Sequence, residues 1–168
     1  WTSRWMTQLG GRVVALDISP AALRIGARLF EKLPVLGEHH PPEFLPFDGV
    51  RIGLPDASVD RVCCFDAFHH VANPETVLRE MARVLRPRGV AVVACVGDGH
   101  LAELRQIRRE VFGEAWSAAL TDTFDASVGS RVLPSRFGEV DWRVYPDRLD
   151  CRDPDDVVAY LESTPPVE

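Results

Sequence analysis

The sequence has little positive charge, no long apolar run and almost no lysine. Lys32 is the only lysine, and the formal net charge of the 168 residues is −6, which excludes a general basic field for nucleic acid. The longest purely apolar run, Val90 to Val96, is far shorter than the roughly 20 residues that a membrane helix needs. No apolar segment of signal-peptide type follows Arg4. We therefore expect a cytoplasmic protein with neither a nucleic-acid nor a membrane partner.

Several motifs of known chemistry are also missing. The four cysteines form no C-x-x-C pair, so reduced thiols are a simpler interpretation than a zinc site. No G-x-S-x-G nucleophile elbow and no phosphate-binding P-loop is present. His39 and His40 lie in a polar loop with no third ligand nearby in the sequence, so we expect no metal. The chain starts with Trp1 rather than Met, which indicates processing or a piece of a longer protein.

What is present is a globular composition, with 46% apolar and 26% charged residues, and a regular alternation of strand and helix signals. This alternation predicts an α/β fold, a parallel sheet with helices on both faces. One helix begins at Ser19 and Pro20 and ends before Pro34, and a second begins at Asn73 and Pro74. The predicted strands are Arg12 to Leu16, Glu43 to Phe47, Arg61 to Phe65 and Val90 to Val96.

The last third has a different pattern. We expect a helix from Leu101 to Phe112, short strands at Val140 to Val144 and Leu149 to Cys151, and a final helix opening at Asp153 and Pro154.

Three acidic residues follow predicted strands, at Asp17, Asp48 and Asp66. In open α/β sheets the ligand crevice lies beyond the carboxyl ends of the strands, so these positions are the best candidates for a binding site. Asp17 can accept hydrogen bonds from both hydroxyls of a nucleotide ribose, or it can share a helix cap with Ser19. Asp48 with Gly49 can present a carboxylate to an exocyclic amine, or form an ordinary Asp-Gly turn.

His69 and His70 follow the same strand as Asp66. Either histidine can act as a general base near neutral pH, and the structural alternative is that one caps the next helix and the other packs beneath it. Arg79, Arg83 and Arg86 are interpreted as one solvated helix face.

Three segments together resemble the class I S-adenosylmethionine-dependent methyltransferases, in their small-molecule branch with a ubiquinone/menaquinone-biosynthesis-like catalytic domain. The segments are VVALDISPAALRIGARL, FDGVRIGLPDASVDRVCCFDAFHHV and NPETVLREMARVLRPRGVAVVA, and the tail YPDRLDCRDPDDVVAYLES is similar to the closing segment of bacterial members. The resemblance implies a Rossmann-like sheet in a single, partial methyltransferase domain over residues 1–168. Residues 1–99 would form the cofactor-binding core and residues 100–168 the C-terminal helices and short strands.

The resemblance also implies roles for individual residues. Asp17 binds the ribose of S-adenosyl-L-methionine, Ile18 packs against the adenine, and Asp48 with Gly49 reads the adenine amine. The remaining positions lie at the methionine end of the cofactor and at the substrate side. These are Phe65 and Asp66 at the strand end, and His70, the second histidine of a frequent pair; Asp66 and His70 are the catalytic candidates. The implied reaction is direct displacement of the activated methyl group by a small-molecule acceptor.

The sequence departs from that family in two places. The first strand and the glycine-rich loop are missing, and Trp1 to Leu9 is similar to the helix that follows that loop. The missing strand would be central, flanked by the strands at Val13 and Arg61. Arg88 stands where the family has a glycine, a milder change because a type I turn accepts most residues.

Three hypotheses follow from these patterns. The leading one is a small-molecule methyltransferase domain, truncated at the front. The second is a non-catalytic remnant or partner subunit of the same fold, in which self-association as a homodimer supplies the missing sheet contact. The third is a nicotinamide-dependent oxidoreductase that shares the ribose-binding carboxylate.

Overall fold

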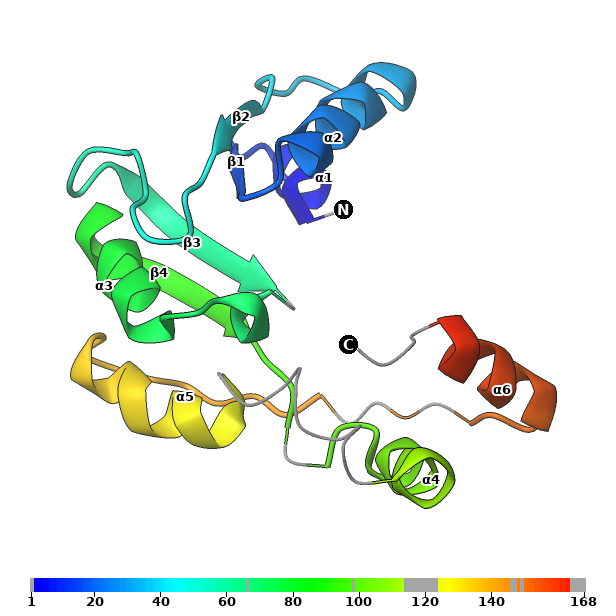
Figure 1. Cartoon of the computed structure of the whole chain (residues 1–168). Coiled ribbons are helices and arrows are strands. Elements are labelled where there is room, and N and C mark those ends of the chain that lie inside the picture. The colour runs from blue at the N-terminus through cyan, green and yellow to red at the C-terminus, as the bar shows by residue number, and fades with distance from the viewer. Residues whose placement is uncertain are drawn as a thin grey trace. The chain divides into compact units, whose positions relative to one another are not determined.

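The computed structural model describes residues 2–65, 67–97, 99–113, 124–145, 148 and 150–163. The chain divides into two compact units, Trp1–Cys95 and Val96–Glu168. Figure 1 labels the elements along the chain. Among the described residues, no helix has both the length and the apolar character needed to cross a bilayer.

The first unit begins with α1 (Thr2–Gln8) and a parallel strand pair, β1 (Val14–Asp17) with β2 (Glu43–Pro46). The helix between these strands, α2 (Pro20–Lys32), starts where it was predicted. The Ser19 side chain accepts a hydrogen bond from the backbone N–H of Ala22 (3.2 Å), and proline occupies the first turn, where it sacrifices no helical hydrogen bond. Phe30 of α2 packs edge-on against Phe44 of β2, with 5.8 Å between ring centroids.

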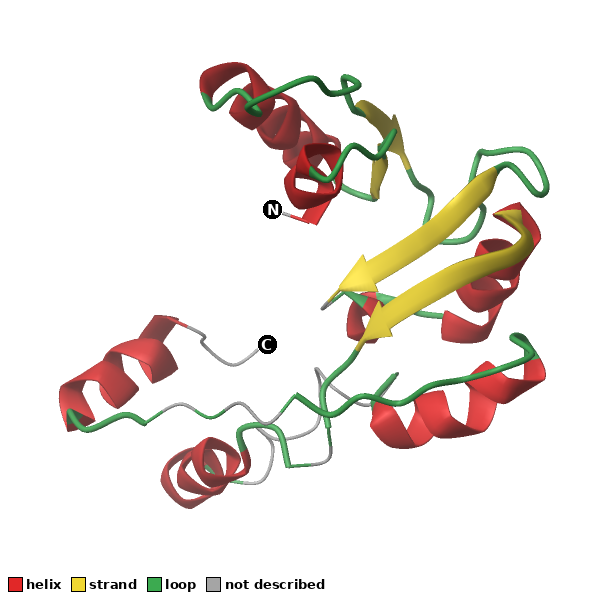
Figure 2. Ribbon diagram, turned by 180° about the vertical axis from the view of Figure 1, so that it is seen from behind, coloured by secondary structure: helices red, strands yellow, loops and turns green. Residues whose placement is uncertain are grey.

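A second parallel pair holds the core of this unit. β3 (Val59–Phe65) pairs with β4 (Leu85–Ala94), and between them run a short 3-10 helix, η1 (Phe68–His70), and α3 (Pro74–Val84). Figure 2 shows α3 behind the two strands, on one face of the pair. Its apolar face is buried, as its periodicity predicts. The fully buried side chains of this region include Phe68, Leu78, Met81 and Val84.

The parallel α/β fold is as predicted, but the four strands form two separate pairs instead of one sheet. No backbone ladder in the described part of the chain joins β1 or β2 to β3 or β4. The break falls between β1 and β3, where the resemblance expects the family's first strand. No residue of β1 is fully buried, although strands of doubly wound parallel sheets are normally covered on both faces.

The region before Val90 differs from the prediction, because β4 begins at Leu85 and residues 87–89 lie inside the strand instead of in a turn before it. Arg88 has a φ of 67°, in the left-handed region, and therefore does not adopt type I turn geometry. Gly89 follows it in a crowded place. A Cβ at Gly89 would lie 2.8 Å from Leu85 Cδ2 and 2.9 Å from the carbonyl oxygen of Arg86, so only glycine fits without a shift.

The second unit contains α4 (Ala102–Phe112), α5 (Ala126–Val132), a 3-10 turn η3 (Leu133–Ser135) and α6 (Pro154–Ser163). The helices at Leu101 to Phe112 and at Pro154 were predicted, whereas α5 was not. The sequence feature that could have predicted α5 is Asp125. Its side chain caps the helix by accepting a hydrogen bond from the backbone N–H of Val128 (2.8 Å).

The strand predicted at Val140 to Val144 is wrong. These residues form no strand, and Val144 is 90% exposed. Alternating apolar residues make a strand only where a neighbouring strand completes the hydrogen bonds, and no such pairing occurs here. The second predicted strand, Leu149 to Cys151, includes Leu149, which lies outside the described residues, while Asp150 and Cys151 are not in a strand.

Candidate functional site

Asp17 ends β1 and takes part in the start of α2. Its Oδ1 accepts a hydrogen bond from the backbone N–H of Ser19 (2.7 Å), so the capping alternative is realised in the structure. That bond occupies only one carboxylate oxygen. No described residue donates a hydrogen bond to Oδ2 of Asp17, and a carboxylate has about four acceptor positions. The cap orients Asp17 and leaves it able to accept from a ligand.

The pairing of β1 with β2 brings the two predicted acidic positions to the same edge. Asp17 lies opposite Pro46, and the backbone N–H of Phe47 donates to the carbonyl oxygen of Asp17 (3.0 Å). Beyond this bond, a Cβ placed on Gly49 would lie 4.0 Å from Ile18 Cγ2. Ile18 itself is 65% exposed, an apolar side chain open to solvent beside the turn.

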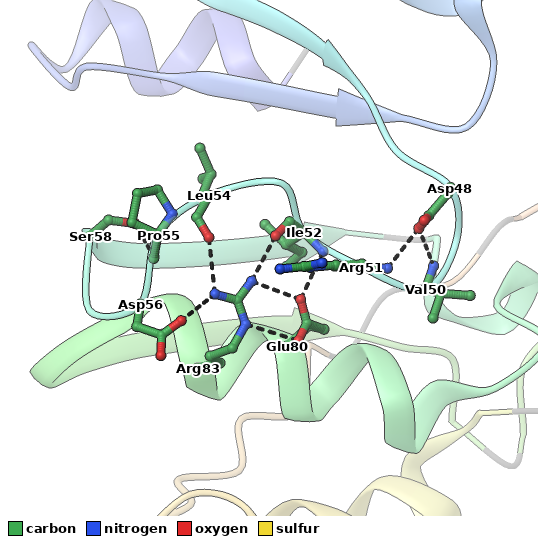
Figure 3. A network of polar contacts seen from close by, with 10 residues as sticks. All are labelled: Asp48, Val50, Arg51, Ile52, Leu54, Pro55, Asp56, Ser58, Glu80 and Arg83. Carbon is green, nitrogen blue, oxygen red and sulfur yellow. Dashed lines mark hydrogen bonds and ion pairs between the residues drawn. The ribbon is translucent and has the colours of Figure 1, made fainter.

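Asp48 builds a tight turn of its own. Its Oδ1 accepts from the backbone N–H groups of Val50 (2.8 Å) and Arg51 (2.6 Å), as Figure 3 shows. These hydrogen bonds, with that of Arg51 the larger, hold the pKa of Asp48 below its usual value, so the side chain is a carboxylate at neutral pH. Gly49 has a φ of 80°, which glycine adopts without strain. The ordinary-turn interpretation is therefore correct for the backbone, and no described residue bonds to the other oxygen, Oδ2.

An open depression of about 700 Å³ lies along the segment that follows β2. It begins at the end of the strand and includes the Asp48 turn. Its lining residues are Pro46, Phe47, Asp48, Arg51, Ile52, Gly53, Leu54 and Pro55.

Two residues of α3 hold this segment, and the sequence interpretation missed both. Arg83 donates to the carbonyl oxygens of Ile52 (2.7 Å) and Leu54 (3.0 Å) and to the Asp56 carboxylate (2.5 Å). Glu80 accepts from Arg83 and from the backbone N–H of Ile52 (3.0 Å). The expectation of a solvated arginine face is thus wrong for Arg83. It is also wrong for Arg86, which lies in β4 and pairs with Asp60 (2.8 Å).

The candidates on the second strand pair are described less completely. Phe65 is the last residue of β3, opposite Ala94, and His70 ends η1 with an exposed side chain. Asp66 and the side chain of His69 lie outside the described residues. No ladder among the described residues joins this pair to β1 and β2, so strand pairing links Asp17 with the Asp48 turn but does not link Phe65 or His70 to them.

Among the described residues, the cysteines and acidic side chains form neither a thiolate nucleophile nor a metal site. Burial raises the pKa of Cys64 to about 11 and also raises that of its neighbour Cys63, so neither is a thiolate nucleophile at neutral pH. Within the part of the chain that the structure describes, no group of three or more His, Cys, Asp or Glu residues is placed to hold a metal ion.

The residues at the ends of β1 and β2 fit the adenosine half of a nucleoside cofactor. Ribose hydroxyls and the adenine amine are donors, and the carboxylates of Asp17 and Asp48 are acceptors with remaining capacity. The exposed Ile18 offers an apolar surface to a base, and the bare backbone of Gly49 allows close approach.

Comparison with known proteins agrees with this chemistry. The family model described as "Methyltransferase domain" matches residues 1–93, more than half of the chain. The malonyl-[acyl-carrier protein] O-methyltransferase of Serratia marcescens is 32% identical over 114 residues, which are 67% of this chain and 40% of that protein. The ubiquinone/menaquinone biosynthesis C-methyltransferase UbiE of Acidiphilium cryptum is 27% identical over 146 residues, 86% of this chain and 55% of the relative. The chain thus spans about half, or less, of the length of these curated relatives.

The fold is similar to that of solved methyltransferases. A SAM-dependent methyltransferase from Methanosarcina mazei superposes with a TM-score of 0.66 at 18% identity, over 88% of this chain and 78% of that one. This likeness shows the fold alone, and the family model adds the sequence match. The chain belongs to the class I S-adenosylmethionine-dependent methyltransferase family.

Proposed function

We propose that this chain binds the adenosine part of S-adenosyl-L-methionine and acts in methyl transfer to a small-molecule acceptor. The observation that carries the proposal is the pairing of β1 with β2, which brings Asp17 and the Asp48 turn to one edge, where a Cβ on Gly49 would lie 4.0 Å from Ile18 Cγ2. Two carboxylate acceptors together with an exposed apolar side chain, Ile18, suit a nucleoside, which has a hydroxyl-bearing sugar at one end and an amine at the other.

In this proposal each residue of the edge has one task. Asp17 accepts hydrogen bonds from the ribose hydroxyls, Ile18 packs against one face of the adenine, and Asp48 accepts from the 6-amino group. The backbone of Gly49 lies close to the base because it has no side chain. Phe65, the last residue of β3, and Asp66, the next residue in the sequence, contact the methionine part of the cofactor.

When bound, the cofactor supplies a methyl group activated by its positively charged sulfur. Aligning the acceptor with that methyl group in a site that excludes water accounts for much of the rate of such a displacement. His70 and Asp66 take the catalytic roles. His70 accepts the proton of an acceptor that binds in its protonated form, and Asp66 orients the reacting groups.

The nature of the acceptor is proposed only as a class. The Serratia relative is an O-methyltransferase and the Acidiphilium relative is a C-methyltransferase, so relatives at 32% and 27% identity to this chain differ in the acceptor atom that their names give. A small molecule fits the acidic chain, which has a formal net charge of −6 and no field to recruit nucleic acid.

A second candidate function is a non-catalytic partner subunit of the same fold. It is favoured by the two strand pairs, which no ladder among the described residues joins. In that case self-association covers the unpaired strand edges, and the cofactor is not held.

Calorimetric titration of the folded chain with S-adenosylhomocysteine tests the proposal. We expect micromolar binding, and we expect Asp17→Ala to weaken it by about tenfold or more, or about 1.4 kcal/mol, because charge-assisted hydrogen bonds to the ribose are lost. Glu31→Ala, which removes an exposed carboxylate of α2, is the matched control and should bind as the unchanged chain does. Unchanged affinity of a folded Asp17→Ala chain contradicts the ribose role.

The same titration separates the alternatives. A folded chain that binds neither S-adenosylhomocysteine nor a nicotinamide dinucleotide supports the partner subunit. Binding of the dinucleotide alone supports the oxidoreductase hypothesis and contradicts methyl transfer.

A further inference from the structure

The side chains of Glu80 and Arg83 on α3 form hydrogen bonds with the loop between β2 and β3. We call this pair of side chains the Glu80–Arg83 clamp. Figure 3 shows both side chains extending from the helix into the loop. Besides its three contacts with the loop, the Arg83 guanidinium donates to both carboxylate oxygens of Glu80, at 2.9 and 2.8 Å. These five hydrogen bonds match the five N–H donors of a guanidinium, so its fork is fully used.

The clamp acts on both backbone groups of one residue. The N–H of Ile52 donates to Glu80, and the C=O of Ile52 accepts from Arg83. Ile52 is only 4% exposed, so these two groups lie where water cannot easily replace a lost partner. The clamp therefore determines the position of Ile52 in the loop.

Ile52 directly follows the turn that Asp48 forms. The turn bonds run from the N–H groups of Val50 and Arg51 to Asp48, so Arg51 links the turn to the clamped residue. On the other side, Phe47 is bonded to the carbonyl oxygen of Asp17. The segment from Phe47 to Ile52 is thus anchored at one end by the strand pair and at the other end by α3.

We propose that the Glu80–Arg83 clamp holds the Asp48 turn in the position from which its carboxylate distinguishes an adenine amine from a carbonyl, so that the clamp sets the base selectivity of the site. The inference rests on the proposed function, because it takes Asp48 as the group that meets the base. Arg83 touches no ligand in this scheme and is a positioning residue.

The physical reason is the sharp distance dependence of a hydrogen bond. A carboxylate accepts from the 6-amino group of adenine but repels the 6-oxo group of hypoxanthine, because both are then acceptors. That contrast is large only while the carboxylate stays within hydrogen-bond distance, since a contact at 3.6 Å or beyond is no longer a hydrogen bond. If the loop is released from α3 at Ile52, the Asp48 carboxylate no longer stays at that distance, and the site no longer distinguishes the 6-amino from the 6-oxo group.

The loop is also bound to α3 by backbone hydrogen bonds, so the side chains of the clamp can be changed without detaching the whole loop. The backbone N–H groups of Ala57 and Ser58 donate to the carbonyl oxygens of Arg83 and Val84, at 3.0 and 2.8 Å. These backbone bonds survive a change of the Arg83 side chain and hold the far end of the loop against α3. We therefore expect Arg83→Lys and Glu80→Gln chains to fold.

The test is a comparison of two ligands, S-adenosylhomocysteine and S-inosylhomocysteine, which differ in the 6-amino and 6-oxo groups. By calorimetry the unchanged chain should prefer the adenosyl compound by about tenfold or more, as expected when a buried or fixed acceptor loses its donor. In Arg83→Lys, which keeps the charge but not the fork, the preference should fall to about threefold or less, and Glu80→Gln should lower it in the same direction. Arg79→Lys, an exposed position on the same helix, is the control and should keep the full preference.

The outcomes separate this inference from the proposed function. If Arg83→Lys and Glu80→Gln are folded by circular dichroism and keep the full preference, the clamp is only structural and the inference is overturned, while the proposed function stands. Equal weakening of both ligands, with the ratio unchanged, overturns it in the same way. An unchanged chain that binds neither ligand overturns the proposed function, and the inference with it.

Discussion

Arg88 has a left-handed backbone conformation, with a φ of 67°, at an exposed position between Pro87 and Gly89. A side chain with a Cβ is strained there by about 1–2 kcal/mol, while glycine is not, although glycine loses more freedom on folding. We expect Arg88→Gly to raise the free energy of unfolding by about 0.5 kcal/mol.

Urea denaturation of Arg88→Gly, followed by circular dichroism, measures this change. Arg88→Ala is the matched control, because it removes the same charged side chain but keeps the Cβ. An alanine chain as stable as the glycine chain would show that the side chain, not the backbone angle, carries the effect.

At the scale of residues, the sequence was informative where a local pattern determines the position. Asp17 and Asp48 follow apolar strands, so their place at the strand ends could be predicted, and both the cap and the turn alternatives are seen. Arg83 could not be interpreted in this way. Helical periodicity describes only the helix itself, whereas the loop partners of Arg83 lie 27 to 31 residues earlier, in a segment whose path no local pattern specifies.

At the scale of elements, the clamp makes the attachment of the loop to α3 dependent on pH. The hydrogen bond from Arg83 is the largest cause that holds the pKa of Glu80 below its ordinary value of 4.5. A carboxyl group with a lowered pKa in the folded state stabilises that state fully above its unfolded pKa, and loses the contribution as the pH falls through the folded value.

We expect Glu80→Gln to unfold at lower urea concentration than the unchanged chain at pH 7, and the difference to shrink as the pH falls below 4.5. Paired urea titrations at pH 7 and at about pH 3 measure it. Other carboxyl groups titrate alike in both chains and cancel in the comparison. A difference that is equal at both pH values would mean that the charge of Glu80 is not what holds the loop.

The helices were predicted more accurately than the strands, for a physical reason. A helix satisfies its own backbone, so the caps at Ser19 and Asn73 and the apolar periodicity of α3 were sufficient to place α2 and α3. A strand depends on a neighbour that may be distant in sequence. The apolar alternation at 140–144 therefore predicted a strand that the structure does not form.

At the scale of the whole molecule, α2 carries an apolar surface that nothing in the described structure covers. Ile25 and Leu29, one turn apart, are 59% and 42% exposed, and Leu33, directly after the helix, is exposed as well. No residue of α2 is fully buried, although the helix is amphipathic. Stripes of this kind mark association surfaces in soluble proteins.

We therefore predict that the chain self-associates through this stripe. Analytical ultracentrifugation should show a dimer whose fraction rises with concentration, because burial of apolar surface drives the contact. The double variant Ile25→Ser, Leu29→Ser should shift the equilibrium toward monomer, while Arg28→Ser, on an exposed position of the same helix, should not. A chain that stays monomeric at all concentrations contradicts the prediction.

The pairing of β1 with β2 also determines where an inserted residue would leave the candidate site unchanged. Asp17 lies opposite Pro46, so the ladder plus two residues of chain separates the carboxylates at positions 17 and 48. A residue inserted in the polar loop before Glu43 leaves that register intact and costs little, because loop-closure entropy grows slowly with length. A residue inserted after Pro46 displaces Asp48 by about 3.3 Å along the chain. The segment before β2 therefore tolerates insertions, whereas the length of the segment after β2 sets the spacing between the carboxylates of Asp17 and Asp48.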